Sequence, residues 1–207
     1  MKLLAYGEDG LTLWALTRRL DELLRALQDP SDSSECVVLF RPSFGRRGGE
    51  DGPQFGEFDF IVLTEKAILL GESKWNSSSE EVRDGALILR PEQMSRHNIM
   101  HFYINRFSFG SYETWDEFIA AETSRFSEMG LGKALAPKGS RLAKNLNEVL
   151  RKIRGRFHSP PPITDVLLYL YRKDEQVSLP SKGPEGFHLV LLDYSADSEG
   201  NMISIEM

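Results

Sequence analysis

The sequence has a single cysteine, Cys36, among its 207 residues. One thiol cannot form a disulfide within the chain, and it cannot supply the several thiolates of a structural zinc site. Both absences suit a protein that folds in a reducing compartment. The fold must therefore be held together by its apolar core rather than by covalent cross-links.

Long apolar runs are also missing. The N-terminal segment MKLLAYGED has only a short apolar run before acidic residues follow, which is too short for a secretory signal peptide. No window approaches the length of a transmembrane helix. We therefore expect a cytoplasmic protein with no membrane partner.

The chain lacks an overall positive charge, because its formal net charge is −6 at pH 7. This argues against a protein that coats nucleic acid without specificity. The charge is unevenly distributed, however, since residues 133–158 contain eight Lys or Arg and one acidic residue, or about +7. Such a segment is either a solvated basic helix or a phosphate-binding surface, and charge alone favours the first.

The order of the apolar patterns predicts a mixed α/β fold. Apolar residues at helical spacing predict helices over 11–28, 91–107, 114–126 and 139–156. Apolar and β-branched runs predict strands over 36–44, 86–90, 165–171, 187–194 and 202–207, and a hairpin over 56–75. No repeat or firm boundary divides the chain, so we expect one domain.

The hairpin sequence, GEFDFIVLTEKAILLGESKW, is apolar in its middle and charged at both open ends. If Glu65 and Lys66 form a two-residue loop, the numbers of paired residues sum to 131. Both faces are then largely apolar, which predicts a central position in the sheet. Glu-Lys is not a favoured loop sequence, so a wider turn is an alternative. The predicted pairs are Leu63 with Ile68, Ile61 with Leu70, Asp59 with Glu72, and Glu57 with Lys74.

This register places the Asp59 and Glu72 carboxylates opposite each other, with β-carbons roughly 5 Å apart. At an effective dielectric of about 20 they repel by roughly 3 kcal/mol, so a positive charge is needed between them. Lys74, on the same face, offsets part of this repulsion, and Mg²⁺ offsets more. A metal ion with a neighbouring lysine suits phosphodiester hydrolysis. The alternative is a solvated strand end with an ordinary Glu57–Lys74 ion pair.

These residues resemble the signature of the PD-(D/E)xK, or restriction-endonuclease-like, nuclease superfamily. That signature is an acid at the start of one strand and E-x-K at the end of the next, here Asp59 in GEFDF and Glu72-Ser73-Lys74 in LLGESKW. The chain is most similar to the nuclease-related (NERD-type) and archaeal junction-resolvase branches over about residues 5–107. That similarity rests on Gly7-Glu8, Gly56-Glu57-Phe58-Asp59, Glu72-x-Lys74 and Gln93, in that order. Phenylalanine instead of proline precedes Asp59, which departs from the literal motif.

The resemblance implies an α/β fold with a restriction-endonuclease-like αβββαβ core and a mixed central sheet flanked by helices. One domain, 1–207, would carry the core motifs in 1–107 and a basic helix and further strands in 108–207. The implied metal is Mg²⁺ or Mn²⁺, bound by Asp59, Glu72, the Ser73 carbonyl and Glu8. Lys74 would be the catalytic lysine and Gln93 would face the site. Glu22 is an alternative to Glu8.

Basic residues outside the signature are candidates for nucleic-acid binding. Arg46 and Arg47, in the Gly-rich loop 45–54, and Arg96 contact phosphates or are simply solvated. On the basic helix, we expect Lys144, Arg151 and Lys152 to hold a phosphate backbone.

Two further patterns leave alternatives open. His97 and His101 are spaced to share one helix face, which suits either a metal or ordinary packing, but the H-E-x-x-H motif is absent. Trp75 directly follows the lysine, where it packs in the core or lines a cleft.

The sequence thus predicts a metal-dependent nuclease that hydrolyses phosphodiester bonds of DNA. One alternative is a catalytically inactive nucleic-acid-binding or assembly module on the same fold. Another is a protein–protein interaction domain whose C-terminal strands pair with a partner's sheet edge. RNA is an open alternative to DNA, and a homodimer is compatible with each of these hypotheses.

Overall fold

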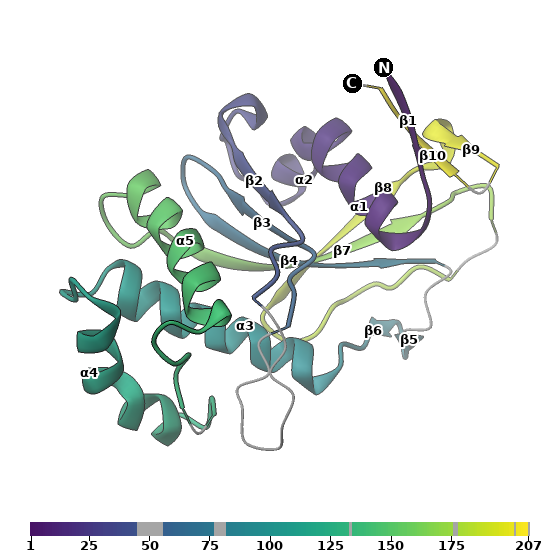
Figure 1. Ribbon diagram of the computed structural model, residues 1–207. Helices are drawn as coiled ribbons and strands as arrows, with labels where there is room; N and C mark the ends of the chain where they lie inside the picture. The colour runs from purple at the N-terminus through teal and green to yellow at the C-terminus, as the bar shows by residue number, and fades with distance from the viewer. Residues whose placement is uncertain (45–55, 77–81, 133, 176–177, 201, 207) are drawn as a thin grey trace. The chain divides into compact units, whose positions relative to one another are not determined.

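The computed structural model describes residues 1–44, 56–76, 82–132, 134–175, 178–200 and 202–206 (Figure 1). The chain divides into two compact units that alternate along the sequence. The first unit contains Met1–Arg41, Phe58–Leu89 and Pro162–Met207, and the second contains Pro42–Glu57 and Arg90–Pro161. Each unit is described by itself below.

The first unit is built on a five-stranded mixed sheet with the strand order β2-β3-β4-β7-β8. The first three strands pair antiparallel, whereas β4, β7 and β8 run parallel to one another. The mixed α/β fold predicted from sequence is therefore confirmed. The strands are β2 (Val37–Phe40), β3 (Phe60–Leu63), β4 (Ile68–Trp75), β7 (Ile163–Tyr171) and β8 (Phe187–Asp193).

Two helices, α1 (Gly7–Arg18) and α2 (Leu20–Ala26), cover one face of this sheet. Their leucines and Trp14 pack on apolar side chains of β3, β4, β7 and β8 in one continuous core. The sequence predicted a single helix over 11–28. The structure starts it earlier, at Gly7, and breaks it at Arg19, whose backbone leaves the helical region and whose guanidinium pairs with Glu22 and Asp197.

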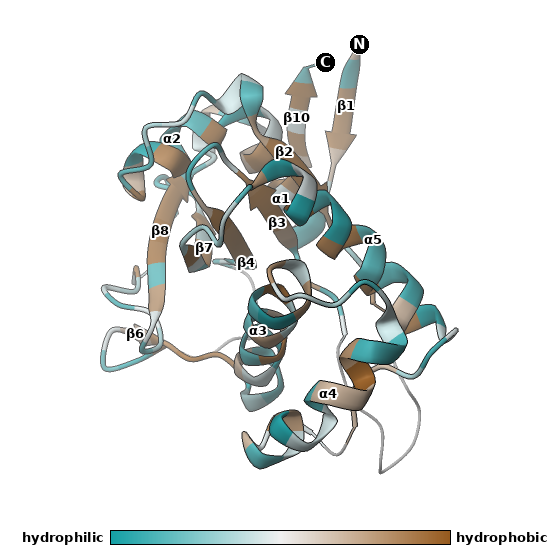
Figure 2. Cartoon of the chain, turned by 90° about the vertical axis from the view of Figure 1, so that its left-hand side faces the viewer, coloured by the Kyte–Doolittle hydropathy of each residue, from teal (hydrophilic) through white to brown (hydrophobic). Residues whose placement is uncertain are grey.

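The hairpin of β3 and β4 has the predicted loop and register. Leu63 pairs with Ile68 and Ile61 with Leu70, so partner numbers sum to 131. Glu65 and Lys66 form the loop, which Thr64 closes with a bond from its N–H to the carbonyl of Ala67 at 3.0 Å. Thr64 Oγ1 also accepts from the N–H groups of Lys66 and Ala67, which explains why an unfavoured loop sequence is tolerated here. Both strands are buried and coloured as hydrophobic along most of their length in Figure 2.

A second, three-stranded sheet joins the two ends of the chain, which lie side by side in Figure 1. It contains β1 (Lys2–Ala5), β10 (Met202–Glu206) and β9 (Ser198–Glu199), and β10 lies between the other two. The strand predicted over 202–207 is present as β10. Strand β1 was not predicted, because it has only four residues and three of them are exposed. A small hairpin, β5 (Val82–Arg83) with β6 (Ala86–Leu87), replaces the single strand predicted over 86–90.

The second unit is helical, and its three predicted helices are confirmed. They are α3 (Pro91–Tyr103), continued by a π-helical turn (Ile104–Ser108), α4 (Trp115–Glu128) and α5 (Arg141–Arg156). Thr114 and Ser140 cap α4 and α5 by accepting backbone N–H groups with their hydroxyls. Phe102, Tyr103, Phe118 and Phe126 form an aromatic core. In the described part of the chain, no helix is long and apolar enough to cross a membrane.

Candidate functional site

The carboxyl end of the central strand β4 carries three polar residues in a buried position. Glu72, Ser73 and Lys74 are 1%, 0% and 3% exposed, in a sheet whose other residues here are apolar. Burying a charged side chain costs several kcal/mol unless it is paired or hydrogen-bonded, so their partners are decisive. The partners of Ser73 and Lys74 include Asp59, just before β3, and Glu8, in the first turn of α1.

Asp59 lies immediately before β3 and is fixed to β4 by two bonds. Its backbone N–H donates to the carbonyl of Gly71 at 3.2 Å, and its carboxylate Oδ2 accepts from the backbone N–H of Ser73 at 2.7 Å. Its own carbonyl accepts from the N–H of Arg41 at 3.0 Å. The acid is thus held between β2 and β4 on a rigid backbone frame.

The ammonium group of Lys74 lies between two oxygen groups. Nζ donates to the carbonyl of Ser73 at 2.8 Å and lies 3.6 Å from Glu8 Oε1. Glu8 is in the first turn of α1, so α1 and the end of β4 meet at this pair. Glu8 and Lys74 are therefore neighbours, and the role of Glu8 in a metal site stays a prediction.

Burial raises the pKa of the Glu8 carboxyl to about 7, from its ordinary value of 4.5. The positive charge of Lys74 opposes this shift, and the negative charge of Asp59 adds to it. The influence of Asp59 places both carboxyls in one electrostatic cluster with Lys74. Glu22, the alternative to Glu8, instead pairs with Arg19 at 2.6 Å in α2.

The predicted cross-strand pair of Asp59 with Glu72 is wrong. The ladder ends with Phe60 opposite Gly71, one pair short of Asp59 with Glu72. The Asp59 carboxylate instead accepts from the backbone N–H of Ser73 at 2.7 Å. Glu57 belongs to the second unit, where it forms an isolated bridge with Ser43, and its pairing with Lys74 stays a prediction.

The chemical type of the donor atoms, carboxylate oxygens and the Ser73 carbonyl oxygen, suits a hard divalent cation such as Mg²⁺. Among the described residues, no three His, Cys, Asp or Glu side chains are close enough to bind a metal by themselves. The Lys74 ammonium already contacts two of the oxygen groups assigned to the metal, Ser73 O and Glu8 Oε1. This point of the sheet therefore attracts positive charge.

The remaining predicted site residues belong to the second unit. Gln93 is buried, and its side-chain carbonyl accepts the N–H of Arg90 at 3.1 Å, capping α3. Arg96 lies near Gly56, within the same unit. The roles of both residues stay predictions. Arg46 and Arg47 lie outside the described residues.

The basic residues of α5 are arranged by its helical periodicity. Lys144, Arg151 and Lys152 are exposed, whereas Leu146, Leu150 and Ile153 face the core of the unit. On α3, His97 is buried and His101 half-buried, which favours packing over the metal alternative.

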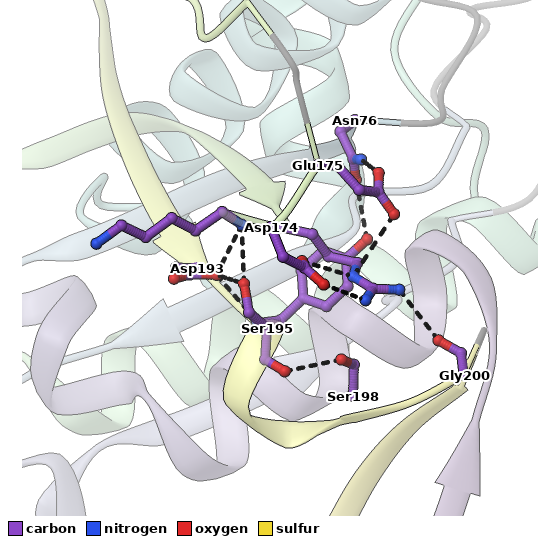
Figure 3. Close-up of polar contacts among 10 residues, drawn as sticks. Asn76, Asp174, Glu175, Asp193, Ser195, Ser198 and Gly200 are labelled. Carbon is purple, nitrogen blue, oxygen red and sulfur yellow. Dashed lines mark hydrogen bonds and ion pairs between the residues drawn. The ribbon is translucent and has the colours of Figure 1, made fainter.

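Sequence reasoning missed a polar network after β7 and β8. Arg172 bonds Asp174 at 2.5 and 3.0 Å and the carbonyl of Gly200 at 3.2 Å (Figure 3). Figure 3 also shows Asn76 beside Glu175, to which it donates a hydrogen bond. The sequence feature that could have predicted this network is the charged run RKDE, which directly follows an apolar strand. Ligands of α/β proteins commonly bind at the carboxyl ends of such strands.

Comparisons of the chain with protein-family models, with curated proteins and with solved structures found no match.

Proposed function

We propose that the protein is a metal-dependent nuclease that hydrolyses phosphodiester bonds of DNA, with its active site at the carboxyl end of β4. One observation carries the proposal: the buried ammonium of Lys74 lies between the Ser73 carbonyl and Glu8, while Asp59 is bonded to the same Ser73. A basic group and acids held on a rigid frame at the end of a central strand are the arrangement that the E-x-K signature requires.

The order of elements supports a restriction-endonuclease-like fold. A helix, three antiparallel strands, a further helix and a parallel strand occur in the order α1, β2, β3, β4, α3 and β7, with α2, the small hairpin β5–β6, α4 and α5 as additional elements between them. The acid precedes the second strand of this series, and Glu72 and Lys74 end the third. These positions are those of the superfamily's signature.

The residues have distinct roles in the proposed reaction. Asp59, Glu72 and the Ser73 carbonyl would hold Mg²⁺ or Mn²⁺, with Glu8 completing the acidic cluster. The bound ion would supply a Lewis acid for a phosphoryl oxygen and for the attacking water. Lys74 orients that water and offsets negative charge on the phosphate. The water oxygen bonds to phosphorus and loses a proton to solvent, while the P–O bond to the sugar breaks and the leaving sugar oxygen takes a proton from solvent.

The exposed face of α5 supports a nucleic-acid substrate despite the acidic total charge. Lys144, Arg151 and Lys152 are exposed on it, and Glu148 is its one acidic residue. Basic side chains spaced along a helix bind phosphates without reading sequence. This face is assigned to the DNA backbone.

The decisive experiment incubates the purified chain with plasmid and linear DNA in Mg²⁺, in Mn²⁺ and in EDTA. We expect cleavage only with a metal ion, and a loss of at least about 100-fold in Glu72→Gln and Lys74→Met. The matched controls are Glu65→Gln and Lys66→Met, a second Glu and Lys of the same hairpin that lie exposed in its loop. These should cleave as the unchanged protein does.

Thermal unfolding of each variant separates lost chemistry from lost structure. Folded Glu72→Gln and Lys74→Met proteins that cleave like the unchanged protein would overturn the proposal. Equal residual cleavage in both would indicate a contaminating nuclease.

A catalytically inactive nucleic-acid-binding module is the second candidate. The contact of Lys74 Nζ with the Ser73 carbonyl favours this candidate, because the ammonium group can occupy the position that a metal ion would take. Salt-dependent retention of DNA without cleavage in any metal would support this candidate over the nuclease.

A further inference from the structure

A pocket of about 300 Å³ lies within the first unit, at the carboxyl ends of three neighbouring parallel strands. Trp75 ends β4, Arg172 follows the last residue of β7, and Tyr194 follows the last residue of β8, and all three line it. The volume is at the lower end of the range of small-molecule sites. None of these residues is used in the proposed hydrolysis.

One wall of the pocket is aromatic. Tyr6 and Trp75 meet edge to face, with ring centroids 6.0 Å apart and an interplanar angle of 83°. Tyr6 is 66% exposed, although a large aromatic ring gains little by remaining in water. Leu11 and Ile203, which are buried, add an apolar surface beside this wall. The wall therefore offers exposed ring surface to a flat, partly apolar ligand.

The rest of the lining is polar and includes Arg172, Glu175 and the hydroxyl-bearing Tyr194. The positive charge of Arg172 is already compensated, by Glu175 at 3.5 Å in the lining and by Asp174 at 2.5 Å outside it. Asn76 links two of the lining residues, because it donates to Glu175 and accepts from the Tyr194 hydroxyl at 2.9 Å (Figure 3). The pocket therefore has no uncompensated positive charge for a phosphate, whereas the Glu175 carboxylate can accept from a ligand that donates N–H groups.

The pocket adjoins the candidate active site through the chain itself. Gly7 lines the pocket and precedes Glu8, and Trp75 lines the pocket and follows Lys74. Successive side chains of a strand point to opposite faces, so the pocket and Lys74 lie on two sides of one strand end. If a single nucleic-acid strand crosses the carboxyl end of β4, it can place a phosphate beside Lys74 and the neighbouring base in the pocket on the other side.

We infer that this pocket binds an unpaired nucleobase of the substrate strand, packed against Tyr6 and Trp75, with its exocyclic amino group directed at Glu175. The inference rests on the proposed nuclease function, and it names the substrate class. A base inside a duplex is stacked on both faces and cannot enter. The substrate is therefore single-stranded DNA, or DNA with unpaired nucleotides next to the cut bond.

The test measures binding rather than cleavage, so that its outcome does not depend on the metal. Fluorescence anisotropy of a labelled single strand and of the matching blunt duplex is recorded in EDTA at several salt concentrations. Tyr6→Ala should weaken single-strand binding about 5- to 150-fold, the range for loss of one base–aromatic stack. Duplex binding should change less than about twofold. Tyr6→Phe, which keeps the ring, is the matched control and should bind like the unchanged protein.

A second variant tests which edge of the base is read. Adenine and cytosine carry exocyclic amino groups and thymine has none, so oligo-dA and oligo-dC should bind more tightly than oligo-dT. Glu175→Gln should reduce or reverse this preference, because an amide can donate to a thymine carbonyl.

Each outcome is distinct from the test of hydrolysis. Tyr6→Ala that binds the single strand normally, or that loses single-strand and duplex binding equally, would overturn the base pocket and leave the nuclease standing. Single-strand binding that depends on Tyr6, without metal-dependent cleavage, would support the base pocket and contradict the nuclease proposal. Because Tyr6 is exposed, the variant is expected to fold, and thermal unfolding checks this.

Discussion

The carboxylate of Asp59 accepts a hydrogen bond from the backbone N–H of Ser73 at 2.7 Å, just beyond the last pair of the β3–β4 ladder. The bond ties the acid before β3 to the middle residue of Glu72-Ser73-Lys74. It sets the position of one proposed metal ligand relative to the two others, Glu72 and the Ser73 carbonyl.

Asp59→Ala removes the acceptor of a buried N–H, since Ser73 is 0% exposed. We expect a loss of about 1–3 kcal/mol in the free energy of unfolding, measured by urea titration. Asp59→Asn retains an acceptor and should lose less than about 1 kcal/mol. Both variants should lose Mn²⁺ binding in calorimetry. Equal stability of the two variants would show that the bond to Ser73 does not matter.

Glu8 should make stability depend on pH. The pKa of Glu8 in the folded protein, about 7, is above its ordinary value of 4.5. Its contribution to the free energy of unfolding is therefore fully present below about pH 4.5 and is lost as the pH rises through 7. The full shift corresponds to about 3 kcal/mol, and solvent screening of a side chain that is 30% exposed reduces it to about 1–2 kcal/mol. Glu8→Gln should remove this dependence, so its stability relative to the unchanged protein should rise between pH 4.5 and 8.

The control for this prediction is a change of charge outside the site. Glu65→Gln, in the exposed hairpin loop, should leave the pH dependence intact. Asp59→Asn should lower the pKa of Glu8, because the charge of Asp59 contributes to raising it. Carbon-13 NMR titration of the Glu8 carboxyl measures both effects, and an ordinary pKa in the unchanged protein would contradict them.

Gly71, directly before Glu72, has no room for a side chain. A Cβ atom there would lie 2.0–2.3 Å from three ring atoms of Phe60, its partner in the ladder, which is fully buried. Gly71→Ala should therefore destabilise the protein by at least about 1–3 kcal/mol in chemical unfolding. Adding Phe60→Leu should recover part of this loss, so the double variant should be more stable than the sum of the single effects.

Gly155→Ala is the matched control for this substitution. Gly155 lies in α5, and a Cβ atom there meets nothing within 4 Å. The change should stabilise the protein by about 0.5–1 kcal/mol, through helix propensity alone. Similar effects at the two glycines would mean that the ring of Phe60 does not fill the space over Gly71.

Local pattern was enough to predict the hairpin, because loop length and alternation fix the register of neighbouring strands. It also predicted that Asp59 lies beside Glu72-Ser73-Lys74, where its carboxylate accepts from the Ser73 N–H. That the three side chains meet there stays a prediction. Local pattern could not predict that the ladder stops at Phe60, because the Asp59 carboxylate takes a backbone N–H that regular pairing would leave to a carbonyl.

Contacts between distant segments were not predictable in the same way. Strand β1 pairs with β10 across almost the whole chain, and neither strand carries a marker of its partner. The Arg172 network joins residues that follow β4, β7 and β8, so its members meet only once three parallel strands are in register. The raised pKa of Glu8 likewise depends on burial that no motif encodes.

Neutralising the basic face of α5 should weaken DNA binding without changing sequence preference. Arg151→Gln with Lys152→Gln removes two exposed charges, so the slope of log affinity against log salt should fall in magnitude by about 2. Lys138→Gln is the matched control in the same unit, because Lys138 is already paired with Asp116 and its charge is compensated. Anisotropy titrations at several salt concentrations measure the slope. An unchanged slope in the double variant would exclude α5 from the phosphate contacts, even if the site at the end of β4 cleaves DNA.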